Sequence, residues 1–261
     1  MSDAEDAVEL SVEIAARPAT VFRCVTQSDL LSRWLQAEVR LEPRVGGDVR
    51  IDFARYGTVV EGRVLELRTD ELVVFSWGVA AGPQAAEMPA GSTRVSLRLT
   101  PTAAGTRVTL RHEGIPTAQG RRDHAMGWTG YLGSLAGVAP LANVEGGVEA
   151  LWDRWFAAWA ETDGAARDRL LGATLADDGT FADSHAEGRG REFVSEWIGV
   201  CQGMFPGTRL SRDGPVLHTR GALLVEWQAH SADGSKVARG INHGRLSADG
   251  RLAGVEGFWR T

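Results

Sequence analysis

Two titratable side chains, Asp183 and His185, stand two positions apart in the segment 180–193. We interpret the start of this segment as a short strand, in which alternate side chains share a face. Phe181, Asp183 and His185 would then share one face. Buried acids are uncommon unless they are paired or functional, so an inward-facing Asp183 would be a candidate proton acceptor. The alternative is a carboxylate at a rim, or one that caps a turn.

The composition restricts the class of function. The chain has 261 residues, of which 43% are hydrophobic and 24% charged, as in a soluble globular protein of one large or two ordinary domains. A net charge of -6 without clustered arginines argues against nucleic acid as a partner. No apolar run reaches membrane-spanning length, and the acidic start lacks the pattern of a secretory signal. We therefore expect no membrane partner and a cytoplasmic location.

Cofactor and metal signatures are not evident in the sequence. It contains no phosphate-binding glycine loop, no nucleophile elbow and no zinc-ligand spacing, so we predict no cofactor and no metal. His112 and His124 are interpreted as hydrogen-bonded structural histidines. Cys24 and Cys201 lie far apart in apolar, helix-like contexts, so we predict that both are small core residues.

The first half of the chain has the pattern of a long antiparallel meander with helices before and after it. An alternating strand at 8–15 precedes two short helices, and further strands follow between residues 37 and 112, interrupted by a loop at 79–91. A closing helix is predicted at about 117–138. It carries a stripe of small residues that includes Gly127 and Gly130, and each mid-helix glycine costs about 1 kcal/mol against alanine. The stripe predicts close approach to the sheet, space for a ligand, or a helix held by packing alone.

The second half begins with helices and ends with strands. The aperiodic residues 141–147 predict a linker between domains at 1–140 and 148–261. Three amphipathic helices are predicted, at 148–162, 165–175 and 191–204, with the strand that contains Asp183 before the third. The remaining strands are predicted at 209–216, 222–231, 237–246 and 252–259. This order predicts an α+β domain whose sheet wraps around its helices.

Four motifs in the first half carry a family resemblance: Arg-Val-Gly-Gly at 44–47, Gly-x-Val-x-Glu-Gly at 57–62, Phe-x-Trp at 75–77, and His-x-Gly before a Gly-Trp helix. Together with the order of elements, they resemble the prokaryotic domains similar to the activator of Hsp90 ATPase, of the START and Bet v 1 helix-grip superfamily. The resemblance implies a cavity for an apolar ligand between the closing helix and the sheet. Its candidate walls are Trp34, Trp77, Trp128 and Tyr131, for which core packing is the alternative.

The second half carries another set of motifs: Phe-x-Asp at 181–183, Gly-Arg-Gly-Arg-Glu-Phe at 188–193, Phe-Pro at 205–206, Asp-Gly-Arg-Leu at 249–252 and Gly-Phe-Trp at 257–259. These resemble the SnoaL-like polyketide cyclases, which share a cone fold with nuclear transport factor 2 and ketosteroid isomerase. The resemblance implies that Asp183 occupies the place of the isomerase base. Trp155 and Asn242 would replace the two oxyanion-binding residues, and this departure argues against steroid isomerase activity itself.

The resemblance leaves proton transfer or aldol-type cyclisation open, with Asp183 as base and His185, Asn242 or His243 as acid or orienting group. Adjacent residues of a strand face opposite ways, so either Asn242 or His243 faces the cone, and the family alignment favours Asn242. The expected ligand contacts in the cone are aromatic: Trp155, Trp159, Phe181, Trp197, Trp227 and Trp259.

We thus predict an α+β protein with a helix-grip domain followed by a cone domain. Its predicted function is to bind an apolar small molecule, polyketide-like or polycyclic, in one or both cavities. Cyclase- or isomerase-like proton transfer in the cone is an open possibility, so the sequence does not decide whether the protein is an enzyme. The alternative is a non-catalytic ligand carrier or a protein-interaction module, including a co-chaperone-like role for the first domain. Because relatives often dimerise through the exposed sheet of the cone, a homodimer is also among the expected assemblies.

Overall fold

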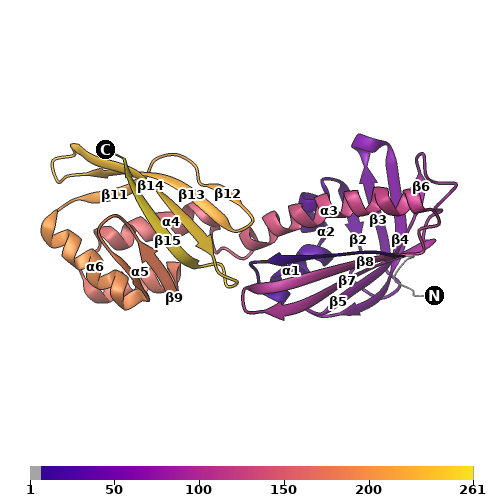
Figure 1. Cartoon of the computed structure of the whole chain (residues 1–261), viewed down its shortest axis with the longest axis horizontal. Helices are drawn as coiled ribbons and strands as arrows, with labels where there is room; N and C mark the ends of the chain where they lie inside the picture. The colour runs from indigo at the N-terminus through magenta and orange to yellow at the C-terminus, as the bar shows by residue number, and fades with distance from the viewer. Residues whose placement is uncertain (1–6, 261) are drawn as a thin grey trace. The chain divides into compact units, whose positions relative to one another are not determined.

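The computed structural model describes residues 7–260 and confirms the predicted α+β class. The chain divides into two compact units, Met1–Ala139 and Pro140–Thr261, which are described separately below (Figure 1). Within the described range, none of the helices combines the length and the apolar character needed to cross a membrane.

The first unit is an antiparallel sheet with a long helix across it (Figure 1). The strands follow the order β1-β8-β7-β5-β4-β3-β2, and β6 pairs with β4. The strands are β1 (Ala7–Ile14), β2 (Glu38–Leu41), β3 (Asp48–Phe53), β4 (Thr58–Arg68), β5 (Leu72–Trp77), β6 (Val79–Ala81), β7 (Thr93–Thr102) and β8 (Gly105–Glu113). The helices are α1 (Pro18–Thr26), α2 (Ser28–Leu35), the 3-10 turn η1 (Ala54–Tyr56) and α3 (Ala118–Leu141).

Two features of this unit differ from expectation. The segment 79–91, predicted as a loop, contains the strand β6 and buries Met88, whose carbonyl accepts a hydrogen bond from Val79 N at 2.7 Å. A Cβ added at Gly127 or Gly130 of α3 would meet nothing within 4 Å. Close approach to the sheet therefore does not explain these helix glycines, which face open space.

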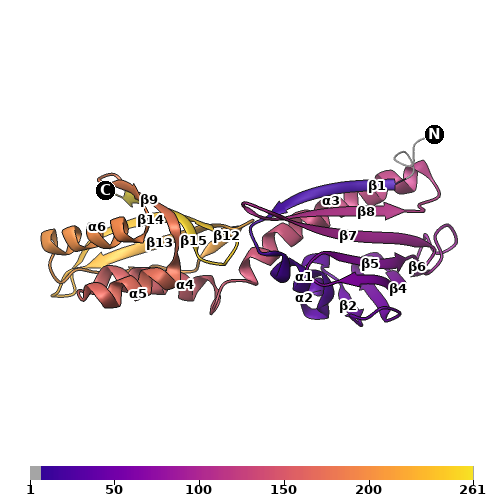
Figure 2. The same cartoon turned by 90° about the horizontal axis from the view of Figure 1, so that it is seen from below.

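The second unit packs three helices against a curved sheet (Figure 2). Its strands follow the order β10-β9-β15-β14-β13-β11, with β12 beside β13, and only the β15–β9 pair is parallel among the described strands. The helices are α4 (Gly147–Ala160), α5 (Gly164–Thr174) and α6 (Arg191–Met204). The strands are β9 (Leu175–Ala182), β10 (Glu187–Arg189), β11 (Arg209–Arg212), β12 (Leu217–Thr219), β13 (Ala222–His230), β14 (Lys236–Leu246) and β15 (Leu252–Arg260). The single strand predicted at 209–216 is therefore replaced by the shorter β11, with β12 beyond it.

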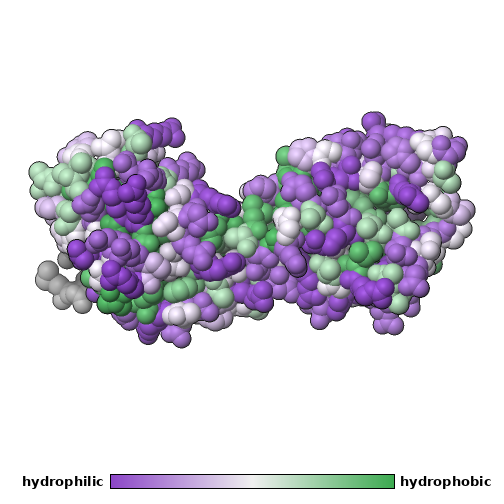
Figure 3. Space-filling view, turned by 180° about the vertical axis from the view of Figure 1, so that it is seen from behind, coloured by the Kyte–Doolittle hydropathy of each residue, from purple (hydrophilic) through white to green (hydrophobic). Residues whose placement is uncertain are grey.

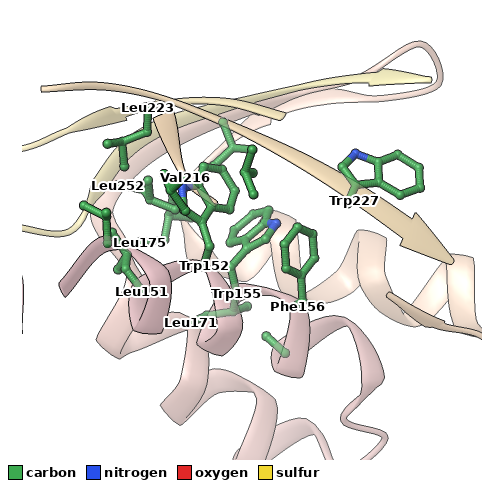
Figure 4. Packing of buried hydrophobic residues seen from close by; sticks show 14 of the residues in the cluster. Leu151, Trp152, Trp155, Phe156, Leu171, Leu175, Val216, Leu223, Trp227 and Leu252 are labelled. Atoms are coloured by element: carbon green, nitrogen blue, oxygen red, sulfur yellow. The ribbon is translucent and has the colours of Figure 1, made fainter. Parts of the chain in front are cut away.

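The core of the second unit lies between α4 and the sheet. Trp152 and Trp155 of α4 are 0% and 1% exposed and point toward the strands in Figure 4, where Leu223 and Leu252 lie. The spacing of three between the two tryptophans puts them on one side of the helix. Burial of such large side chains stabilises the fold by roughly 2 kcal/mol each, and it fixes the helix that carries one wall of the cavity described next.

Glycines on β14 make room for these rings. A Cβ at Gly240 would overlap the Trp227 indole and the Phe258 carbonyl, and one at Gly244 would come within 2.6 Å of the Trp152 ring. The two glycines share the inner face of β14, with Asn242 between them. The rings therefore cover the strand on both sides of Asn242 and leave its side chain facing inward.

Candidate functional site

A cavity of about 460 Å³ opens inside the second unit, between its helices and the inner face of the sheet. It brings together every side chain that the sequence predicts for the cone site. The predicted residues in its wall are Trp155, Trp159, Phe181, Asp183, His185, Trp197, Trp227, Asn242 and Trp259. These side chains come from α4, α6, β9, β13, β14, β15 and the turn after β9, so the tertiary fold assembles the site.

Aromatic rings in edge or tilted contact form most of the wall. The Phe181 ring of β9 lies 5.8 Å from Trp159 and 6.1 Å from Trp155, measured between ring centroids. Across the sheet, the Trp227 and Trp259 centroids are 5.2 Å apart at nearly a right angle. These tilted and edge-on contacts are the arrangements that aromatic pairs prefer. The wall is therefore apolar and largely aromatic.

Asp183 lies in a turn, so the prediction of a strand through His185 is wrong. Strand β9 ends at Ala182, and Asp183 Oδ1 accepts hydrogen bonds from the backbone N–H groups of His185 (2.7 Å) and Ala186 (2.8 Å). Such local side-chain bonds compete with strand pairing and favour a turn. Asp183 therefore caps a turn through its Oδ1 atom, as the alternative interpretation of the sequence predicted. The same side chain also lines the cavity.

His185 lies on the exposed side of this turn. Its Nδ1 atom is 2.9 Å from the Ser184 hydroxyl, and its ring meets Trp259 edge-on with a centroid separation of 5.8 Å. Trp259 is itself 45% exposed. Both rings therefore belong to the mouth of the cavity.

Asn242 is the buried amide of the cavity. It is 7% exposed and lines the wall, and neither end of its amide forms a hydrogen bond with another described residue. The neighbouring His243 faces the other way, with its Nδ1 atom 2.5 Å from Glu256 Oε2 on β15. Adjacent residues of a strand face opposite ways, so Asn242 faces the inside of the sheet and His243 faces the outside. The Asn242 amide lines the cavity without a hydrogen-bond partner among the described residues, so it is a candidate for contact with a ligand.

Gly257 of β15 lies between Asp183 and Asn242. A Cβ at this position would be 3.3 Å from Asp183 Cβ and 3.4 Å from Asn242 Oδ1. The carboxylate and the amide therefore flank the same stretch of backbone, which is itself part of the cavity wall.

Several wall residues were not singled out from the sequence. Cys201 was predicted as a core residue, but it lines the cavity. Burial raises the pKa of its thiol to about 11, and the charge of Asp183 acts in the same direction, so the thiol is protonated at neutral pH. Its position one helical turn after Trp197 is the signal that could have identified it. Gln202 also contributes to the wall, and its amide N–H groups donate to the carbonyls of Trp159 and Glu161 at 2.9 Å.

The rim of the cavity is apolar. Met204, Phe205 and Val237 line it and are 53%, 59% and 55% exposed. Figure 3 shows hydrophobic groups scattered over an otherwise hydrophilic face of the protein. Exposed apolar groups around a hollow are typical of a binding site.

A second cavity, of about 310 Å³, lies in the first unit. Trp77, Trp128 and Tyr131 line it as predicted, together with Gly127. Trp34 lies elsewhere, in the core, where its indole N–H donates to the Cys24 carbonyl at 2.8 Å. The prediction of Trp34 as a cavity wall is therefore wrong, because this α2 ring is bonded to the backbone of α1.

His112 ties the wall of this cavity together. The Thr93 hydroxyl donates to the Trp77 carbonyl (2.7 Å), so it accepts from His112 Nε2–H at 2.8 Å. The other ring nitrogen, Nδ1, accepts from the Trp128 indole at 3.1 Å. Burial and, to a smaller extent, the nearby His124 lower the pKa of His112 to about 3. His112 is therefore a neutral, hydrogen-bonded histidine, and its bonds join α3 to the sheet.

Comparisons with known proteins bear on both units. Residues 15–139 match the family model described as Activator of Hsp90 ATPase homolog 1-like protein. Over this range the first unit is similar to that family. This match confirms the resemblance predicted for the first unit, which is called the Hsp90-activator-like domain below. None of the curated proteins compared with the chain matches it.

Several solved structures are similar to parts of the chain. A SnoaL-like family protein from Agrobacterium tumefaciens has 28% identity over 43% of this chain and 96% of its own, with a TM-score of 0.41. A protein from Mesorhizobium loti has 25% identity over 49% of this chain and 93% of its own, with a TM-score of 0.45. The Aha1 dimer from Colwellia psychrerythraea has 22% identity over 49% of this chain and 92% of its own, with a TM-score of 0.42.

Proposed function

We propose that the second unit binds an apolar, flat small molecule in its aromatic cavity. The observation that carries this proposal is the amide of Asn242, which lines a wall made mostly of aromatic rings and forms no hydrogen bond with another described residue. Ligand sites combine such apolar walls with a few polar groups that orient the ligand. The cavity volume of about 460 Å³ is within the range typical of small-molecule sites.

The indole N–H donors around the cavity support the proposal that the ligand carries a hydrogen-bond acceptor. The indole nitrogens of Trp159, Trp197 and Trp227 are buried and have no hydrogen-bond partner among the described residues. Buried donors without partners are uncommon in native proteins. An acceptor on the ligand would satisfy one of them after a small movement of the ring.

The cavity of the first unit is the weaker candidate. It is smaller, and Asp123, His124 and Gln84 add polar groups to its wall. The alternative is that the ligand binds in this cavity, or that the Hsp90-activator-like domain acts as a carrier or a protein-interaction module. The binding experiment described next distinguishes the two cavities.

We expect the variant Trp227→Ala to weaken the binding of phenanthrene about tenfold or more, because it removes a large aromatic surface from the wall. Quenching of tryptophan fluorescence or isothermal titration measures the affinity. Trp77→Phe, in the other cavity, is the matched control and should bind phenanthrene like the unmodified chain. If Trp77→Phe binds phenanthrene more weakly and Trp227→Ala binds it like the unmodified chain, the binding site lies in the first unit.

Proton transfer is the second candidate function, and the position of Asp183 favours it. One oxygen of its carboxylate is held by two backbone N–H groups, and the side chain lies beside Asn242 across Gly257. In this proposal Asp183 removes a proton next to a ligand carbonyl, and Asn242 donates to the carbonyl oxygen. His185, at the mouth, is the proposed proton relay.

We expect the protein to accelerate deuterium exchange at carbons next to the carbonyl of bound polycyclic ketones, and Asp183→Asn to reduce this rate by at least about a hundredfold. The variant keeps an oxygen to cap the turn, so the fold should be preserved. NMR in heavy water follows the exchange. An exchange rate equal in both proteins would leave Asp183 without a catalytic role.

The outer face of the cone sheet is the proposed homodimer interface. Leu217, Leu224 and Phe258 are exposed by 61%, 39% and 56%, on β12, β13 and β15. Apolar groups on the uncovered face of a sheet favour association with a second copy. The molar mass from light scattering decides between monomer and dimer.

A further inference from the structure

We propose that the second-unit cavity selects an uncharged, flat ligand that presents a hydrogen-bond donor and an acceptor side by side on one edge, such as a cyclic secondary amide. This inference rests on the proposed binding function and specifies its ligand class. It is carried by the arrangement of Asp183, Asn242 and Gly257.

Asp183 offers an acceptor in a fixed orientation. Its Oδ1 atom is occupied by the backbone N–H groups of His185 and Ala186 at 2.7 and 2.8 Å, while Oδ2 forms no hydrogen bond with another described residue. The two bonds to Oδ1 determine how the carboxylate is oriented. A ligand donor can therefore pair with Oδ2 without first rearranging the turn.

Asn242 offers a donor next to this acceptor. Its side chain is more than nine-tenths buried, lines the cavity, and forms no hydrogen bond with another described residue. Its amide can donate to a ligand acceptor while Asp183, as a carboxylate, can only accept. The two residues thus match a ligand edge with one donor and one acceptor.

Gly257 lies beside both groups and limits the thickness of a ligand edge that could reach them. A Cβ there would come within 3.3 Å of Asp183 Cβ and 3.4 Å of Asn242 Oδ1. Because glycine has no side chain, a thin ligand edge can lie against the backbone and reach both groups. The aromatic rings of the wall, among them Trp155 and Trp227, would cover the faces of such a flat molecule.

The charge of the ligand follows from the same groups. A ligand anion at this edge would meet the Asp183 carboxylate, and like charges at short distance repel strongly where water is excluded. A purely apolar ligand would leave the Asn242 amide without a partner, which costs affinity. A neutral ligand with both a donor and an acceptor avoids both penalties.

The test compares phenanthridinone with N-methylphenanthridinone and phenanthrene as probes of the full chain. Phenanthridinone has adjacent N–H and C=O groups, the N-methyl compound lacks the donor, and phenanthrene lacks both groups. We expect phenanthridinone to bind about tenfold more tightly than its N-methyl derivative, as one hydrogen bond to a charged group would produce. Isothermal titration calorimetry measures the affinities.

Two variants locate the effect. Asp183→Asn places an N–H where Oδ2 stood and keeps the oxygen that caps the turn, while Asn242→Leu replaces the amide with an apolar group of similar size. Asp183→Asn should abolish the advantage of phenanthridinone over the N-methyl compound, whereas Asn242→Leu should weaken the binding of both compounds, which share the C=O group. Phenanthrene should still bind to each variant, which also shows that the variant is folded. If phenanthridinone and the N-methyl compound bind equally to the unmodified chain, the inference is overturned and apolar binding stands. If none of the probes binds, both the inference and the proposed function fail.

Discussion

Gly240→Ala should destabilise the second unit by about 3 kcal/mol and abolish binding in its cavity, because the added methyl group has no space. A Cβ at this position would overlap both the Trp227 ring and the carbonyl of Phe258 on the neighbouring strand. The indole can rotate away only by leaving the cavity wall, and the carbonyl is part of the β14–β15 pairing, in which Gly240 is opposite Trp259. The strain caused by the added methyl group would therefore disturb both the pairing of β14 with β15 and the wall of the cavity.

Urea unfolding followed by far-UV circular dichroism measures this loss of stability. Gly203→Ala is the matched control, since Gly203 lies in α6 and a Cβ there would meet nothing within 4 Å. This control should stabilise the chain by about 0.5–1 kcal/mol through helix propensity. Equal stability of Gly240→Ala and the unmodified chain would show that Trp227 does not lie against Gly240.

The second large effect is a loss of first-unit stability in acid that depends on His112. Burial lowers the pKa of His112 to about 3 in the folded chain, whereas an unfolded histidine titrates near pH 6.5. Between these two values the unfolded state binds more protons, so stability falls as the pH falls. For this one group the loss between pH 7.5 and pH 5 is about 2 kcal/mol. Protonation of Nδ1 would also remove the acceptor of the Trp128 indole N–H.

His112→Gln tests this prediction because glutamine can donate to Thr93 and accept from Trp128 but does not titrate. The variant should lose about 2 kcal/mol less than the unmodified chain when the pH is lowered from 7.5 to 5. Hydrogen exchange of β8, measured by mass spectrometry on the full chain, reports the local stability. His218→Gln, at an exposed position of β12, is the control and should keep the pH dependence of the unmodified chain. An identical pH dependence in His112→Gln would mean that His112 is not the responsible group.

The sequence alone determined the class of fold, and it predicted many of the side chains that line the second-unit cavity. The side chains of Trp155 and Trp159 recur at helical spacing on α4, and this periodicity follows from the geometry of a helix regardless of its surroundings. Strand alternation likewise required that Asn242 and His243 face opposite ways. Motif resemblance then predicted which of the two faces the cone, and the structure agrees.

Only the tertiary structure decided where single side chains lie. Asp183 is in a turn because its carboxylate bonds to Ala186 N and because β10 folds back onto β9, pairing Glu187 with Ala182. Trp34 is a core residue because its indole reaches the Cys24 carbonyl, a contact that no local pattern encodes.

The position of Gly257 beside both Asp183 and Asn242 could not be predicted either. It depends on the parallel pairing of β15 with β9 and on the antiparallel pairing of β15 with β14, in which Gly257 is opposite Asn242. Periodicity reports which side chains share a face of one element. The distances between elements come from their packing, and these distances decide which groups can bind one ligand together.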